Sequence, residues 1–304
     1  MQIASTQNFA QTVARLTSQS QAEHNAELIR VSSGKNYQKR SESCPETARI
    51  AELERETKLG TQLAGNLKLG AAWASVSEAR VTSVLEVTAR IQEIAVRASD
   101  TTISETARMA LTRELDGLVE DLLSLANSSQ DGTALFGGTG GENPVAATRD
   151  AEGRIVSVAY AGGADASRSF QAGNTTVEYG VAATGSNGVF ADSASGRDLF
   201  RSALDLRGQI AAGGAVSAAT LAELGQAYDG VTAALVRTGL QDNRLSDLAQ
   251  QAEAEAVARE TRLSGLADTD LAAAAVRLTE LETSLQASLS MAAAMGKISL
   301  LDYL

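Results

Sequence analysis

Two stretches of the sequence place apolar residues alternately three and four positions apart, and this spacing limits the folds open to the chain. The two series are Val84, Val87, Ile91, Ile94 and Ala98, and then Leu111, Leu115, Leu118, Leu122 and Leu125. Such a heptad pattern puts a narrow apolar stripe on a long α-helix, which needs other helices to bury it. The sequence predicts a helical hairpin, with rod packing assigned to the first four residues of each series. Trp73 is expected to continue the first stripe as a core residue.

Capping residues, glycine and proline indicate where helices begin and end. Thr102 and Glu105 have the spacing of a capping box, which predicts the start of the second helix. Gly34 is expected to end an earlier helix, because glycine readily takes the left-handed conformation that closes many helices. The only two prolines in 304 residues, Pro45 and Pro144, are expected at boundaries, since proline breaks a helix interior.

Apolar stripes also occur near both ends of the chain, where they lack an obvious core. Phe9, Val13 and Leu16 repeat at spacings of four and three, and the chain finishes on the apolar sequence SLLDYL. Chain ends usually fray unless something holds them, so we expect partner helices from this chain or from neighbouring chains. The predicted assembly interface consists of Phe9, Val13, Leu16, Leu278, Leu281, Leu285, Leu289, Ile298, Leu301 and Leu304.

The middle of the chain has a different composition. No leucine occurs between Leu135 and Leu199, and glycine, serine, threonine and asparagine are frequent there. Residues 154–160, 168–172 and 175–181 are short runs rich in valine and aromatic residues, which favours β-strands separated by turns. The predicted fold class is therefore mostly α: long helical coiled-coil rods from the N- and C-terminal flanks, with a small β-rich inserted domain.

Charge and rare residues exclude several function classes. A net charge of −11 disfavours nucleic acid and anionic membranes as partners, because both attract basic surfaces. No stretch is apolar enough to span a membrane, and no cleaved signal peptide is recognisable at the N-terminus. Cys44 and His24 are the only cysteine and histidine, which leaves no catalytic or metal-binding constellation. We therefore expect no enzyme activity, no cofactor and no metal.

Four segments together resemble the bacterial flagellin superfamily. They are VSSGK at 31–35, LLSLANSSQDGTALFGGT at 122–139, TGLQDNRLSDL at 238–248, and the closing segment 268–304. The closing segment is most similar to the flagellar hook-associated protein 3 family, because flagellins typically finish on a more polar end. One position departs from the family: an acidic pair usually precedes the proline after SGK, and here Ser43 and Cys44 precede Pro45.

The resemblance implies an extracellular structural role in the bacterial flagellum. In this family the chain ends pair as a coiled coil in an inner ring, the rods form an outer tube and the insert projects. The implied partners are further copies in a ring, the adjacent hook-associated protein, flagellin, and an export chaperone that binds the C-terminal helix. The implied segments are 1–45 and 263–304 for the inner helical domain, 46–140 and 198–262 for the rod, and 141–197 for the β-rich insert.

Three alternatives accompany this interpretation. The chain could be flagellin itself, the bulk filament subunit, which location and copy number would distinguish from a junction protein. A needle-tip or translocator-like protein of a related export system would carry membrane-active apolar segments, and the sequence has none. An enzyme with its active site in the insert is disfavoured, because residues 141–197 contain no histidine or cysteine.

Overall fold

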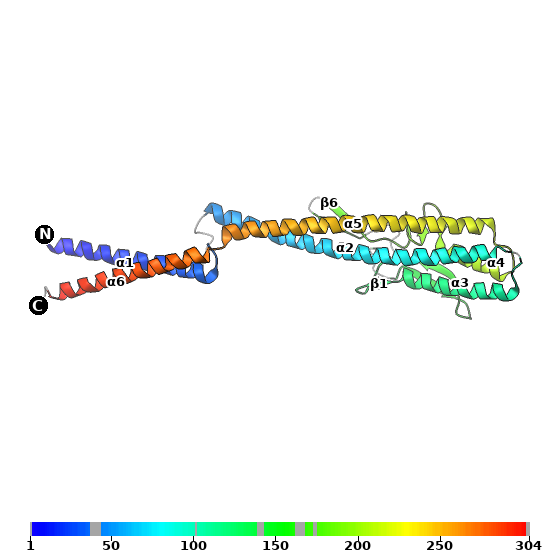
Figure 1. The fold of residues 1–304 in the computed structure, drawn as a ribbon, viewed down its shortest axis with the longest axis horizontal. Helices are drawn as coiled ribbons and strands as arrows, with labels where there is room; N and C mark the ends of the chain where they lie inside the picture. Colours follow the sequence, from blue (N-terminus) through cyan, green and yellow to red (C-terminus); the bar gives the residue numbers. More distant parts are fainter. Residues whose placement is uncertain are drawn as a thin grey trace. The chain divides into compact units, whose positions relative to one another are not determined.

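The computed structural model describes residues 2–36, 44–100, 102–138, 143–161, 168–172 and 175–301. The chain forms two compact units, one made of Met1–Gly60 with Ala254–Leu304 and the other of Thr61–Glu253. The described residues are mostly helical, which confirms the predicted fold class (Figure 1). The helices are α1 (Gln2–Ser33), α2 (Cys44–Ala98), α3 (Glu105–Ala126), α4 (Leu199–Ala211), α5 (Ala218–Ala267) and α6 (Leu271–Leu301).

In the first unit, α1 and α6 lie side by side and run in opposite directions (Figure 1). The less exposed positions recur every three or four residues on both helices, as expected of a two-stranded coiled coil. On α1 these positions are Val13, Thr17, Ser20, His24, Glu27 and Val31. On α6 they are Ala274, Leu278, Leu281, Leu285, Ser288 and Ala292. The two sets form the seam between the helices, and four of the six α1 residues are polar or charged.

In the second unit, the parts of α2 and α5 within Thr61–Glu253 share a seam with the same spacing. Gln92 on α2 donates a hydrogen bond of 3.0 Å to the carbonyl oxygen of Leu224 on α5. Buried seam residues on α2 are Leu67, Ala74, Ser77, Val81, Val84, Thr88, Ile91, Ile94 and Ala98, and on α5 Leu224, Ala227, Val231, Ala234, Thr238, Leu245 and Ala249. Helices α2 and α5 are 55 and 50 residues long, because the seam continues through its alanines and hydroxyl residues.

Helices α3 and α4 complete the main core. Its buried members on these helices are Leu115, Val119, Leu122, Ala126, Leu199, Phe200, Ala203, Leu206 and Ile210. Of the predicted rod-packing residues, Val84, Ile91, Ile94, Leu115 and Leu122 are fully buried, and Val87, Leu111 and Leu118 are partly buried at its edge. Trp73 also packs against this core and is partly buried.

Local signals placed most boundaries correctly, and one was wrong. Gly34 follows the last residue of α1 with a φ of 67°, as predicted for a closing glycine. Pro45 and Pro144 lie next to the starts of α2 and β3. The capping box from Thr102 to Glu105 is not formed: Ser104 is the N-cap of α3, and its side chain accepts a hydrogen bond from the amide of Ala107.

Within the described residues, the strands pair as four separate antiparallel hairpins. They are β1 (Ser129–Gln130) with β2 (Thr133–Ala134), β3 (Val145–Arg149) with β4 (Ile155–Tyr160), β5 (Arg168–Ala172) with β6 (Thr175–Tyr179), and β7 (Ala191–Asp192) with β8 (Arg197–Asp198). The three predicted strands correspond to β4, β5 and β6, whereas β3 and the two-residue strands were missed.

Polar side chains tie the β segments to the helices. The amide group of Asn127 bonds both the N–H and the carbonyl oxygen of Val145, which aligns β3 with the end of α3. The hydroxyl of Tyr160 donates to Asp198 at 2.8 Å, and burial raises the pKa of this phenol well above its usual range. Arg197 donates to the carbonyl oxygens of Gly188 and Val189, so its buried charge is well solvated by backbone. The desolvation of Arg197 lowers its pKa from the ordinary value.

Candidate assembly surfaces

The predicted interface residues of the first unit fall into two groups. Val13, Leu278, Leu281 and Leu285 lie half-buried in the seam between α1 and α6. Leu16 and Leu289 point away from that seam and remain 53% and 51% exposed. The side chains of Phe9, Ile298, Leu301 and Leu304 lie outside the described residues. The assembly role of all ten residues stays a prediction.

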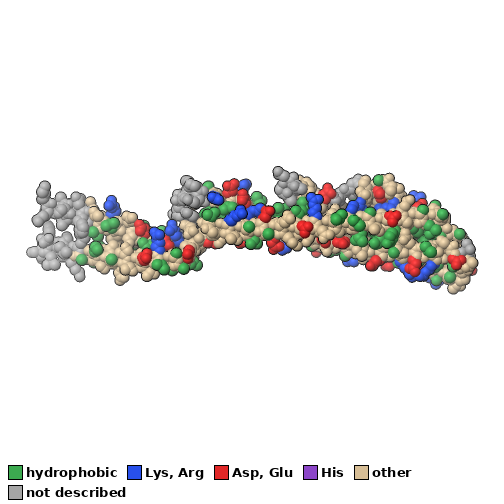
Figure 2. All heavy atoms as spheres, turned by 45° about the horizontal axis from the view of Figure 1, so that its top comes forward, with side chains coloured by type: hydrophobic (Ala, Val, Ile, Leu, Met, Phe, Trp, Pro, Cys, Tyr) green, Lys and Arg blue, Asp and Glu red, His purple; other side chains and the backbone are tan. Residues whose placement is uncertain are grey.

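The structure adds apolar surface that the three-and-four spacing did not reveal. Four further apolar side chains lie outside the predicted interface set and are exposed: Ile29, Leu271, Val276 and Met291. A groove of about 570 Å³ runs along the outer side of α6, lined by Ala273, Val276, Arg277, Glu280, Leu281 and Ser284. Figure 2 shows hydrophobic side chains at the surface between the charged ones. Helices α1 and α6 therefore leave several large apolar side chains exposed after pairing with each other. Exposed apolar surface of this kind is typical of an interaction surface.

Polar residues occupy the centre of the α1 and α6 seam. Nε2 of His24 lies 3.7 Å from the carboxylate of Glu282. Glu27 is only 5% exposed, and its carboxylate lies 3.3 Å from Arg30 one turn later. The buried hydroxyl of Ser20 has no hydrogen-bond partner. An unsatisfied buried polar atom costs about 1–3 kcal/mol, so Ser20 weakens the pairing of the two helices by about that amount.

Two short segments at the end of α1 and the start of α6 are bonded to each other. The amide of Asn36 donates to Ala267 at 2.8 Å, and the amide of Thr269 donates to Gly34 at 2.9 Å. The ammonium of Lys35 donates to the Asp268 carboxylate at 2.5 Å. These bonds fix where α1 and α6 begin to pair. Lys35 also lowers the pKa of Asp268, with a smaller contribution from a neighbouring serine hydroxyl.

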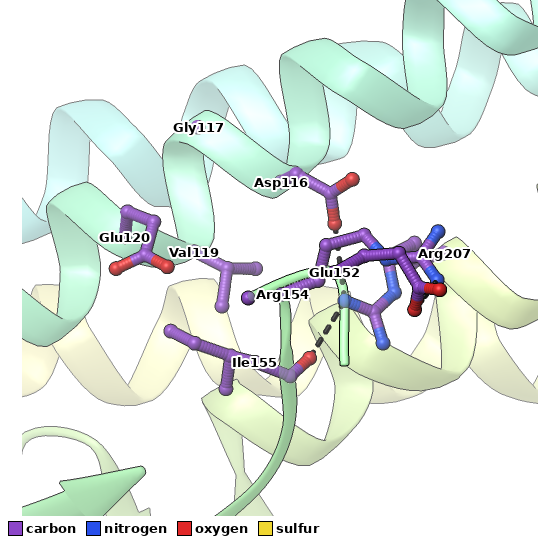
Figure 3. Close-up of a pocket in the computed structure, with 9 residues that line it drawn as sticks. Asp116, Gly117, Val119, Glu120, Glu152, Arg154, Ile155 and Arg207 are labelled. Carbon is purple, nitrogen blue, oxygen red and sulfur yellow. Dashed lines mark hydrogen bonds and ion pairs between the residues drawn. The ribbon is translucent and has the colours of Figure 1, made fainter. Parts of the chain in front are cut away.

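The second unit has a small cavity of about 200 Å³ between α3, α4 and the turn joining β3 to β4 (Figure 3). Arg207 points into it and donates to Asp116 at 3.0 Å and to the carbonyl oxygen of Ile155 at 2.6 Å. At the same wall, Arg149 forms two hydrogen bonds with Glu120 and lowers the pKa of that carboxyl. Both arginines are paired with carboxylates, so their side chains tie α3, α4 and the β3–β4 hairpin together.

Neither a metal site nor a membrane helix is found in the described parts of the chain. No group of three or more histidine, cysteine, aspartate or glutamate residues there could hold a metal ion. None of the described helices has the length and apolarity needed to cross a bilayer.

Comparison with known structures finds the same fold in flagellar proteins. A putative flagellar hook-associated protein from Vibrio parahaemolyticus is 16% identical, with a TM-score of 0.60 over 75% of this chain and 100% of that one. Flagellar hook-associated protein 3 from Legionella pneumophila is 13% identical, with a TM-score of 0.59 over 71% and 98%. The flagellar junction protein FlgL from Legionella pneumophila is 13% identical, with a TM-score of 0.53 over 66% and 99%.

Family models match both helical flanks. Residues 4–140 match the bacterial flagellin N-terminal helical region, and residues 221–304 match the bacterial flagellin C-terminal helical region. The comparison with curated proteins gives no match. The two models together account for well over half of the sequence, on both sides of the insert, and the chain belongs to the bacterial flagellin family.

Proposed function

We propose that this chain is a structural subunit of the bacterial flagellum that joins the hook to the filament. The observation that carries the proposal is the fold. The solved structures that it resembles over nearly their whole length are described as hook-associated or junction proteins. Membership in the flagellin family places the chain among flagellar components, and the flagellum is an extracellular appendage. In this proposal the chain is not an enzyme and takes no cofactor.

The surface of the first unit supports a role that depends on partners. The seam between α1 and α6 is rich in polar residues, while Leu16, Leu289, Val276 and Met291 face outward. Packing against further helices would bury these apolar side chains and stabilise the α1–α6 pair more than its own polar seam does. The proposed partners are other copies in a ring, the adjacent hook-associated protein, flagellin, and an export chaperone on the C-terminal helix. Residues 1–45 and 263–304 form the proposed inner domain of that ring.

Immunogold microscopy of sheared flagella tests the location. An antibody against residues 145–195 is expected to label a single band where hook meets filament. Label along the whole filament would make the chain a flagellin, and absence of label from flagella would favour a subunit of a related export system. Flagella from a strain that does not make this protein are the negative control for the labelling.

A pair of matched variants tests whether the outward apolar face drives assembly. Leu289→Glu introduces a charge at an exposed apolar position, and Gln286→Glu introduces the same charge at an exposed polar position one turn earlier. We expect the first variant to lose the junction band and the second to keep it. Equal labelling of both variants would show that this face of α6 does not contact a partner.

A further inference from the structure

The β5–β6 hairpin is attached to the helices by one face of side chains. Phe170, Val177 and Tyr179 pack into a cluster on α2 and α5 that is separate from the main core. Ser169 and Glu178, on the opposite face, are exposed. Two-stranded hairpins are marginally stable alone, so this one depends on its contact with the helices.

The contact is close at two glycines. A Cβ atom at Gly70 on α2 would lie 3.2 Å from the ring of Phe170, so the ring rests directly on the helix backbone. A Cβ at Gly180, just after β6, would lie 3.2 Å from the indole nitrogen of Trp73. The guanidinium carbon of Arg168 lies 4.4 Å from the centre of the Trp73 ring, a cation–π contact. The hairpin thus lies directly on α2 at these three points.

Two buried polar atoms oppose this closure. The indole N–H of Trp73 and Nε of Arg168 are both buried without a hydrogen-bond partner. Trp73 and Arg168 belong to the contact itself, since the guanidinium lies over the indole ring. Lifting the hairpin would let water reach at least these two groups, and unpaired polar groups favour the hydrated state. Burial of the apolar side chains favours the closed hairpin, and hydration of the two polar groups favours the open one.

The surface beneath the hairpin is apolar and independent of the main core. Leu67, Ala74, Leu245 and Ala249 form it, and all four are buried in the closed state. The main core contains the larger set of residues from α2, α3, α4 and α5 and does not include these four. These four residues also belong to the seam between α2 and α5. Removing the hairpin would therefore leave the main core and this seam in place and uncover the side of the patch that faces the hairpin.

We propose that the β5–β6 hairpin is a strap that opens and closes over α2 and α5 while the helices stay folded. Opening exposes the patch of Leu67, Ala74, Leu245 and Ala249, and closing hides it. The strap is a device of the monomer and does not depend on where the chain acts in the cell. It gives the second unit two surface states, one polar and one with an exposed apolar patch.

Hydrogen exchange of the full chain at increasing low urea concentrations separates strap opening from global unfolding. We expect the amides of 168–172 and 175–179 to exchange about a hundredfold faster than the slowest amides of 81–98, with little dependence on urea. That result indicates an opening that exposes little surface. The proposal is wrong if the hairpin amides and the amides of 81–98 exchange through the same opening, with the urea dependence of global unfolding. It is also wrong if the hairpin amides show no protection from exchange.

Trp73 is the only tryptophan, so its fluorescence reports on the strap. Phe170→Ala should raise the acrylamide quenching constant of Trp73 about twofold and lower hairpin protection about tenfold, while protection of 81–98 stays unchanged. Val177→Ala should act in the same direction, and Glu178→Ala on the exposed face should match the native chain. If Phe170→Ala and Val177→Ala leave quenching unchanged, or lower the protection of 81–98 equally, the hairpin is a fixed part of the core.

Discussion

Single hydroxyl groups decide details that the hydrophobic pattern leaves open. The sequence assigned Val87 to the seam of α2, but Thr88 occupies the buried position and Val87 lies at its edge. The Thr88 hydroxyl donates to the carbonyl oxygen of Val84 at 2.7 Å, so its polar atom is satisfied within the helix. A pattern of apolar letters cannot identify such a residue, because a satisfied threonine fills a seam as a valine does.

The N-cap of α3 provides a test at this scale. Ser104→Ala removes the side chain that accepts from the amide of Ala107, and we expect a loss of about 1 kcal/mol in the free energy of unfolding of the second unit. Urea unfolding followed by circular dichroism measures it. Thr102→Ala is the matched control and should change the free energy by less than about 0.5 kcal/mol. If Thr102→Ala lost more unfolding free energy than Ser104→Ala, the capping box from Thr102 to Glu105 would be supported instead.

Asp268 predicts a pH dependence confined to the join of α1 and α6. Its pKa is lowered in the folded chain, chiefly by Lys35, so the contact stabilises above the ordinary carboxyl pKa and weakens as pH falls through the lower folded value. We expect the amide resonances of Asn36 and Thr269 to shift only below about pH 4. Asp268→Asn should abolish the shift, and Lys35→Met should move it to higher pH. An identical shift in all three chains would assign it to another group.

At the scale of elements, the sequence predicted the long helices and lost the shortest strands. Heptad spacing persists for many turns in α2 and α5, and repetition makes the signal robust. Strand β3 has the sequence VAATR, in which only Val145 is fully buried, so alternation could not reveal it. Strands of two residues, such as β7, carry no periodicity and exist because Arg197 and Tyr160 anchor their neighbours.

The core of the second unit predicts a large effect from one leucine and almost none from another. Leu122→Ala on α3 removes a fully buried side chain, and we expect a loss of about 2–5 kcal/mol in the free energy of unfolding. Leu240→Ala on α5 truncates a leucine that is 66% exposed and should cost less than about 0.5 kcal/mol. Urea unfolding of both variants gives the comparison, and equal losses would mean that the outer face of α5 is buried in solution.

At the scale of the whole molecule, the sequence predicted that the chain ends are assembly elements, a role that stays a prediction, and it did not predict the direction in which each residue faces. Leu285 and Leu289 belong to one apolar stripe, yet the first lies in the seam and the second faces outward. Which side of a stripe meets a helix of the same chain depends on the polar residues opposite, such as His24 and Glu27. Those residues are more than 250 positions away in the sequence, beyond the reach of a local pattern.

Removal of residues 285–304 should separate folding from assembly. The buried clusters of the second unit contain only residues from 67 to 249, so we expect its melting temperature to stay within about 2 °C of the native value. The truncated chain should remain a monomer and fail to join the flagellum. Calorimetry and swimming assays measure the two effects. Normal swimming would show that the C-terminal helix is dispensable, and loss of the second unit's transition would show that it supports that fold.

The bond between Lys35 and Asp268 joins positions 233 residues apart. A ribosome that adds about 5–20 residues per second has about 10 to 50 seconds between making the first of these residues and the second. During that interval α1 has no α6 to pair with, and its weak polar seam gives it little reason to pair elsewhere in the chain. Helix α1 is thus synthesised well before its partner α6, and the duration of translation itself delays the pairing of these two helices.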